Sequence, residues 1–178
     1  IKMGGVLGHC HKSSGVLNLS GCKNHSPITI SNGCAVLQVG GLIGAVAESV
    51  ILTVDDCHNK GNMNLSSVST STNNKNIGGI IGFLRYNVEA ATHVHTVKNS
   101  TNSGNITSSA SAGGETDIAG IVGYAYLNAL IQGCENSGNV STTGQATKPR
   151  TGGITGVAHT NVTIEKCTNK GAVTNTSM

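Results

Sequence analysis

Aromatic residues are nearly absent from this sequence, which contains one Phe, three Tyr and no Trp among 178 residues. A hydrophobic interior must therefore be built from Val, Ile, Leu, Ala and Gly, and a core of bulky aromatic packing is excluded. Val and Ile are β-branched and favour strands. The shortage of rings thus favours a narrow all-β architecture.

Charged residues are also scarce, at 11% of the chain with a formal net charge of +3. No basic run and no interleaving of basic with aromatic residues occurs, so nucleic acid is not an expected partner. No apolar stretch approaches the roughly 18 residues of a membrane-spanning helix, and no secretory leader opens the chain. We therefore expect no direct membrane insertion.

An internal repeat in two parts runs through the whole chain. The first part is Gly-Gly-apolar-apolar-Gly or a close variant, and it starts at Gly4, Gly40, Gly78, Ala119 and Gly152, in steps of 36, 38, 41 and 33 residues. Such steps are typical of solenoids and arrays. The second part is Cys/Ser-x-Asn-x-Gly/Ser-x-apolar, and it starts at Cys22, Cys57, Ser100, Cys134 and Cys167. The repeat predicts one stack of like units, a segment of a longer protein, with approximate units 4–39, 40–77, 78–118, 119–151 and 152–178.

Each unit offers short strand candidates at three places. The first strand follows the Gly pair, with an apolar row at Val6, Leu42, Ile80, Ile121 and Ile154. The second strand has apolar residues two apart, which is the strand period, and it ends just before the Cys position. The third carries Ile28, Met63, Ile106, Val140 and Val173. We predict a parallel β-helix (β-solenoid) of about five rungs, each with three short strands.

Two kinds of irregularity interrupt this pattern. His95 is the one polar residue in a second-strand row, which predicts a slipped register or a bulge in the third unit. The polar stretches after the third strands predict loops on one side of the solenoid, often its binding side, at 66–76, 108–117 and 142–151. A further excursion is expected at 83–92.

The repeated Asn and Cys predict structural ladders. Asn-x-Gly suits a sharp corner, and the stacked amides would bond from rung to rung at Asn24, Asn59, Asn102, Asn136 and Asn169. The equivalent cysteines would lie roughly 4.8 Å apart, within reach of a disulfide, but in-register strands point both Cβ atoms the same way. We expect buried, unpaired thiols at Cys22, Cys57, Cys134 and Cys167 and leave the state of Cys10 and Cys34 open.

The Gly clusters paired with Cys-x-Asn-x-Gly-x-Val resemble the GLUG-type repeats of large bacterial surface proteins, including adhesins and the non-catalytic region of IgA-specific metallopeptidases. The resemblance spans Gly4 to Val173, with departures at Ser26, Pro27, Ser100 and Ala119. It implies a secreted or surface-attached solenoid that serves as stalk, adhesin or filament body. It supplies no catalytic residues and no cofactor.

Catalysis and metal binding find little support in the residues. Asp55 and Asp56 are neighbours that would face opposite sides of a strand, whereas paired-carboxylate hydrolysis needs two groups about 5 to 10 Å apart in a cleft. The histidines of His9-Cys10-His11 and His93-x-His95 lack the four-ligand spacing of a structural zinc site. We expect no enzyme, no cofactor and no metal, and a polysaccharide-active β-helix enzyme is the weakest alternative.

A ligand or partner patch is predicted where aromatic residues share repeat positions. Phe83 matches Tyr124, Arg85 matches Tyr126, and Tyr86 lies beside them. Stacked, these side chains could hold a sugar or anchor a partner chain. The alternative is that they only cap the excursion in the third unit.

Taken together, the sequence predicts an extracellular or cell-surface structural or adhesive solenoid, whose partners are flanking repeats or further copies stacked end to end. The alternative is an adhesin module that binds a glycan or host surface protein through its loops. N-glycosylation sequons, which would be used only in a eukaryotic secreted protein, occur at Asn18, Asn24, Asn64, Asn99, Asn105, Asn139, Asn161 and Asn175.

Overall fold

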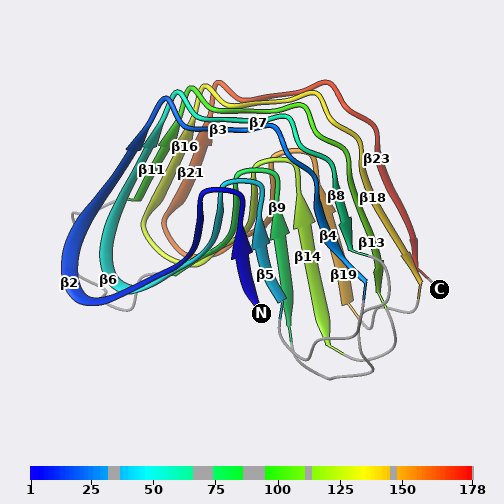
Figure 1. The fold of residues 1–178 in the computed structure, drawn as a ribbon, viewed down its shortest axis with the longest axis horizontal. Coiled ribbons are helices and arrows are strands. Elements are labelled where there is room, and N and C mark those ends of the chain that lie inside the picture. The colour runs from blue at the N-terminus through cyan, green and yellow to red at the C-terminus, as the bar shows by residue number, and fades with distance from the viewer. Residues whose placement is uncertain (32–36, 66–73, 86–94, 111–113, 145–147, 178) are drawn as a thin grey trace.

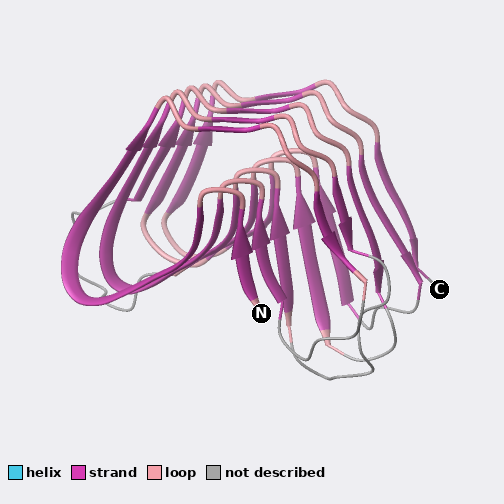
Figure 2. Cartoon of the chain, viewed as in Figure 1, coloured by secondary structure: helices cyan, strands magenta, loops and turns pink. Residues whose placement is uncertain are grey.

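The chain winds into a parallel β-solenoid, as the repeat predicts (Figure 1). The structure, a computed structural model, describes residues 1–31, 37–65, 74–85, 95–110, 114–144 and 148–177. Within these ranges the chain forms strands and turns and no helix (Figure 2). Equivalent strands of successive turns lie side by side.

Four sheets result from this stacking. The first sheet contains β1 (Lys2–Gly4), β5 (Leu37–Gly40), β9 (Lys75–Gly78), β14 (Glu115–Ala119) and β19 (Lys148–Gly152). The second contains β2 (Leu7–Ser20), β6 (Ile43–Asp55), β10 (Ile81–Leu84), β11 (His95–Lys98), β15 (Val122–Ala125), β16 (Ala129–Gln132), β20 (Thr155–Ala158) and β21 (Val162–Glu165). The third contains β3 (Lys23–Asn24), β7 (His58–Asn59), β12 (Thr101–Asn102), β17 (Glu135–Asn136) and β22 (Thr168–Asn169). The fourth contains β4 (Ile28–Ile30), β8 (Met63–Leu65), β13 (Ile106–Ala110), β18 (Val140–Gly144) and β23 (Val173–Ser177).

The cross-section has two apolar cores. One lies inside the second sheet, which folds back on itself, and it includes Leu42, Ile80 and Ile121 of the predicted inward row. The other lies between the first and fourth sheets and includes Val39 and Ile77. In Figure 1 the second sheet is on the left, the fourth on the right and the first between them.

Glycine lets the backbones of the first and second sheets approach closely between the two cores. A Cβ built on Gly82 would lie 2.5 Å from the backbone nitrogen of Val39, and one on Gly123 would lie 2.6 Å from that of Ile77. No side chain fits there, because real Cβ atoms essentially never come within 3.0 Å of such atoms. The repeated third glycine of each cluster therefore allows this contact.

Each turn holds strand segments besides the three predicted. The first sheet and the two-residue strands of the third sheet were not expected as strands, and β13, β14, β18 and β19 occupy much of the predicted loops 108–117 and 142–151. Three of these strands each bury a small hydroxyl residue: Ser108 in β13, Thr116 in β14 and Thr142 in β18. Phe83 belongs to β10, so no excursion starts there. Residues 66–73, 111–113, 145–147 and 86–94 of the predicted loops and excursion lie outside the described residues.

The register of the third unit is regular at His95, contrary to the predicted slip or bulge. His95 pairs with Ala129 and is 1% exposed. Its Nδ1 accepts a hydrogen bond from the backbone nitrogen of Leu52 at 3.2 Å, so a neutral imidazole is accommodated in the apolar row. Burial lowers the pKa of His95 from 6.5 to about 4. The irregular register in β2 falls between Lys12 and Gly15 instead.

We expect His95 to make the fold sensitive to mild acid. Between its unfolded pKa of 6.5 and its folded pKa of about 4, only the unfolded chain binds this proton. Neutral His95 therefore contributes fully to the free energy of unfolding above its unfolded pKa. This contribution, about 3 kcal/mol in all, is lost as the pH falls toward the folded pKa. His95→Leu, which copies Leu52 of the previous turn, should flatten the pH dependence of urea unfolding across this window. Equal slopes for the two proteins would contradict the assignment.

Candidate ligand-binding site

The predicted aromatic patch is assembled on one side of the second sheet. Phe83 and Tyr124 pair in register between β10 and β15, with ring centroids 5.6 Å apart. The rings of Tyr124 and Tyr126 are stacked, with centroids 6.2 Å apart. The guanidinium carbon of Arg85 lies 5.7 Å from the Tyr126 ring centroid. The structure thus brings together Phe83, Arg85, Tyr124 and Tyr126. Tyr86 lies outside the described residues.

His159 extends this patch into the next turn. Its ring stacks on Tyr126 with centroids 4.7 Å apart and planes at 28°. Arg85, Tyr126 and His159 each lie three residues after the last glycine of their cluster, so the repeat alignment contains the signal. His159 was not predicted, because only Phe, Tyr and Arg were compared at these repeat positions.

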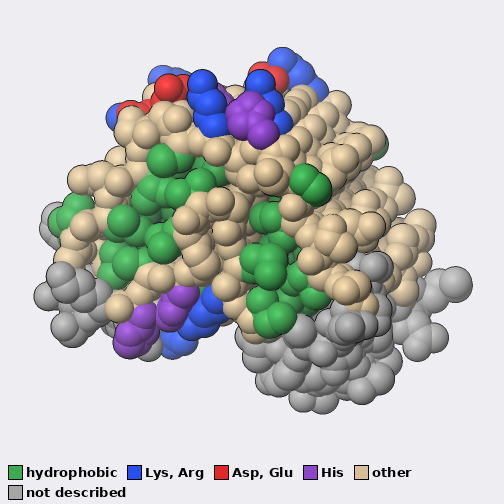
Figure 3. Space-filling model, in the orientation of Figure 1, with side chains coloured by type: hydrophobic (Ala, Val, Ile, Leu, Met, Phe, Trp, Pro, Cys, Tyr) green, Lys and Arg blue, Asp and Glu red, His purple; other side chains and the backbone are tan. Residues whose placement is uncertain are grey.

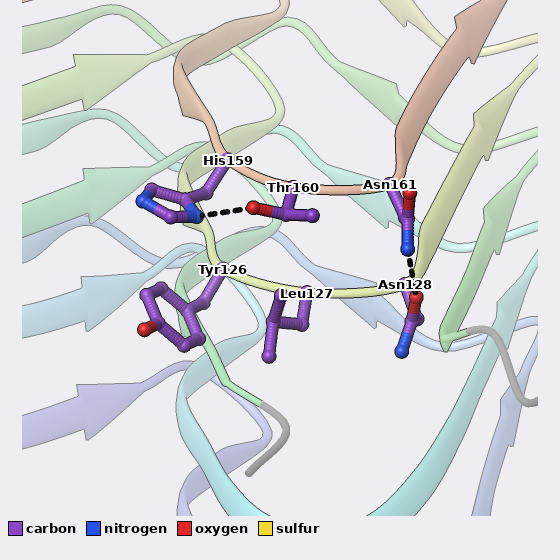
Figure 4. Close-up of a pocket in the computed structure, with 6 residues that line it drawn as sticks. All are labelled: Tyr126, Leu127, Asn128, His159, Thr160 and Asn161. Carbon is purple, nitrogen blue, oxygen red and sulfur yellow. Dashed lines mark hydrogen bonds between the residues drawn. The ribbon is translucent and has the colours of Figure 1, made fainter. Parts of the chain in front are cut away.

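A pocket of about 360 Å³ lies beside the stacked rings, where β15 turns into β16 and β20 into β21. It is lined by Tyr126, Leu127, Asn128, His159, Thr160 and Asn161. Figure 4 shows Tyr126 and His159 on one side, the two asparagines on the other, and Leu127 and Thr160 between them. The pocket thus has a ring wall, an amide wall and a mixed floor.

Local backbone geometry positions the amide wall. Asn128 and Asn161 have φ of 49° and 56°, the left-handed conformation that Asn tolerates and that turns the chain sharply here. Asn161 Nδ2 donates to Asn128 Oδ1 at 3.1 Å. On the other side, His159 Nδ1 and Thr160 Oγ1 are hydrogen-bonded at 3.0 Å, which orients the imidazole. Both walls are therefore held in place before any ligand binds.

An ion-pair network lies on the first sheet near Tyr124. Arg150 Nε donates to Asp117 Oδ1 at 2.6 Å, and Arg150 also bonds Glu115. Asn76 Nδ2 donates to the other Asp117 oxygen at 2.8 Å. Burial raises the pKa of Asp117, and burial followed by the charge of Asp117 raises that of Tyr124. Because one guanidinium bridges both carboxylates, the arrangement serves to hold β14 against β19.

The amide ladder is present through all five turns. Each Nδ2 donates to the Oδ1 of the next Asn at 2.8 to 2.9 Å, in the order Asn24, Asn59, Asn102, Asn136, Asn169. Four of the five ladder residues are buried, and Asn169, in the last turn, is exposed. Among the sequons, Asn24 is engaged in this ladder, whereas the other seven are exposed.

The described cysteines are free thiols. Cys57 and Cys134 are buried, and Cys10, Cys22 and Cys167 are half-buried. Burial raises the pKa of Cys134 to about 12, so its reactive thiolate is disfavoured at neutral pH. Cys34 lies outside the described residues.

The structure describes both members of one of the two histidine pairs, His9 and His11. His9 and His11 lie with ring centroids 5.6 Å apart, and Lys2 Nζ is 3.0 Å from His9 Nε2. Burial and then the charge of Lys2 lower the pKa of His9. His93 lies outside the described residues and His95 is buried. Among the residues that the structure describes, no three His, Cys, Asp or Glu side chains gather to hold an ion.

No family model matches the chain, and no curated protein or solved structure matches it. Within the described ranges, no helix has the length and hydrophobicity that a membrane crossing requires.

Proposed function

We propose that this chain is a non-enzymatic structural or adhesive segment of an extracellular protein, which works as a stalk or filament-forming subunit at a cell surface. The observation that carries the proposal is that like turns stack in register, with continuous sheets and one amide ladder that further turns can extend. β1, β2, β3 and β4 form one end and β19 to β23 the other, and no further described strand pairs with them. The resemblance to GLUG-type repeats of surface proteins supports the same role.

The two ends also expose residues that are buried in the middle turns. Val6 is 47% exposed, Ile164 is 44% and Val173 is 42%, whereas their equivalents in the central turns are 0 to 1% exposed. Figure 3, seen from the side of β1 and β2, shows hydrophobic side chains in two groups, as the two cores predict. Open strand edges with apolar rows favour addition of another strand layer.

The occupant that fits each end is another turn of the same repeat, from a flanking repeat or a second copy. The amide ladder has a direction: Asn24 offers its Oδ1 at one end, and Asn169 its Nδ2 at the other. Copies must therefore stack head to tail, which is a heterologous contact that produces open filaments.

Self-association is expected to grow with concentration in light scattering. Ile164→Lys places a charge on an inward position of the terminal turn and should reduce the apparent mass, because a charge that points inward blocks edge pairing. Thr163→Lys is the matched control, since Thr163 lies next to it and faces outward. A wild-type protein that stays monomeric at every concentration would contradict end-to-end assembly.

A second candidate function is adhesion to a glycan or host surface protein. It is supported by the solvent-facing rings and the pocket beside them, on the corner between β15 and β16. The binding surface was predicted on the loops after the third strands, so its proposed location at this corner is different.

A further inference from the structure

We infer that the pocket between Tyr126, His159, Asn128 and Asn161 binds a pyranose saccharide. The inference rests on the adhesive form of the proposed function and names its site and ligand class. The site lies on the side of the solenoid, on the corner that joins the two halves of the second sheet in the last two turns.

Packing of the apolar cores does not explain why aromatic residues gather at this corner. Neither apolar core contains a Phe or Tyr, and three of the four such residues in the chain lie in the patch: Phe83, Tyr124 and Tyr126. The two cores are built from Val, Ile, Leu, Ala, Met and Cys side chains. The aromatic residues therefore gather on a surface where they add little to the core.

The ring wall suits the apolar face of a sugar. Tyr126 and His159 form a nearly parallel pair, with planes at 28°, and both are at least partly open to solvent. A pyranose presents C–H groups on one face, and these pack on the electron-rich face of an aromatic ring. The guanidinium of Arg85 lies over the Tyr126 ring, outside the residues that line the pocket, and supports that ring from the previous turn.

The amide wall suits the hydroxyl rim of the same sugar. Asn161 is exposed and donates one hydrogen bond to Asn128, which is 7% exposed, so the wall offers a sugar hydroxyl chiefly the amide of Asn161. Thr160 adds a hydroxyl at the floor. The lining contains no carboxylate and no lysine, so recognition relies on stacking and neutral hydrogen bonds.

The size of the pocket agrees with a small saccharide. Its volume of about 360 Å³ is at the lower end of ligand pockets, which span roughly 300 to 1,000 Å³. One pyranose ring has few atoms and cannot bind tightly, so we expect a dissociation constant of about 1 mM for a monosaccharide.

The test is saturation-transfer difference NMR of the whole chain with methyl glucopyranoside, methyl galactopyranoside and N-acetylglucosamine. Saturation of the sugar C–H protons is expected for at least one of them. Tyr126→Ala should weaken that binding about tenfold, whereas Tyr126→Phe, which keeps the ring, should bind within about twofold of the wild type. Absence of saturation with all three sugars overturns the inference.

The amide wall is tested without disturbing the turn. Asn128→Gly removes the amide but keeps the left-handed conformation, and should weaken binding by about fivefold. Asn99→Gly is the matched control, because Asn99 has the same φ of 49° at a corner between the second and third sheets. Equal binding by the wild type, Tyr126→Ala and Asn128→Gly would also overturn the inference. Light scattering of the same samples reports end-to-end assembly separately, so failure of either proposal is distinguishable.

Discussion

Replacing Gly79 with Ala is expected to destabilise the central turns strongly. A Cβ on Gly79 would lie 2.0 Å from the backbone oxygen of Gly120 and 2.4 Å from Cγ of Asn102. Neither atom can yield, because one belongs to the next turn's backbone and the other to the buried amide ladder. We expect the free energy of unfolding to fall by at least about 3 kcal/mol.

Urea unfolding followed by circular dichroism measures this loss, and Gly21→Ala is the control. Gly21 has a φ of 64°, and no atom lies within 4 Å of its built Cβ. Backbone strain alone should cost about 1 to 2 kcal/mol there. A loss at Gly79 no larger than that at Gly21 would show that close approach at the corner is unimportant.

The contact between the cluster glycine and the ladder Asn explains why the two parts of the repeat occur together. In every turn the second glycine of the cluster lies against the ladder Asn: Gly5 on Asn24, Gly41 on Asn59, Gly79 on Asn102, Gly120 on Asn136 and Gly153 on Asn169. Their separations in sequence vary, at 19, 18, 23, 16 and 16 residues. The repeat alone predicts the register of equivalent residues, but a variable spacing cannot reveal which parts of one turn touch.

The strands within the predicted loops 108–117 and 142–151 could not be recognised from hydrophobic periodicity. The polar Ser and Thr stretches were predicted to be loops, yet Ser108 and Thr142 are fully buried in strands of the fourth sheet. The first two turns hold Ile30 and Leu65 at this position, so small hydroxyl residues can also fill an inward strand position. Hydrophobic periodicity therefore understates strand length at the ends of this core.

The candidate site was predictable in part. Repeat positions place Phe83 over Tyr124 and Arg85 over Tyr126, since equivalent residues stack from turn to turn. The pocket depends on a corner made by Asn128 and Asn161, which neither Gly nor Pro marks in the sequence. Its amide wall therefore required the geometry of the turn, whereas the repeat alignment alone can place His159 beside Tyr126.

Replacing Asn102 with Ala should also cause a large loss of stability. Asn102 is fully buried, accepts from Asn59 Nδ2 at 2.8 Å, and donates to Asn136 Oδ1 at 2.8 Å and Gly104 O at 2.9 Å. Ala removes all three bonds and leaves their partners buried with fewer contacts. At about 1 to 3 kcal/mol for each unsatisfied group, we expect the free energy of unfolding to fall by about 3 to 5 kcal/mol.

Asn105→Ala is the matched control for the ladder, because Asn105 is exposed and accepts one hydrogen bond, from the backbone nitrogen of Asn139 at 2.9 Å. Water can replace that bond, so its loss should cost less than about 1 kcal/mol in the same urea experiment. Asn102→Asp adds a second test, because it keeps the shape but turns the donor toward Asn136 Oδ1 into an acceptor. If Asn102→Asp were as stable as the wild type at neutral pH, the direction of the ladder would not matter, and the head-to-tail polarity of the assembly would lose its basis.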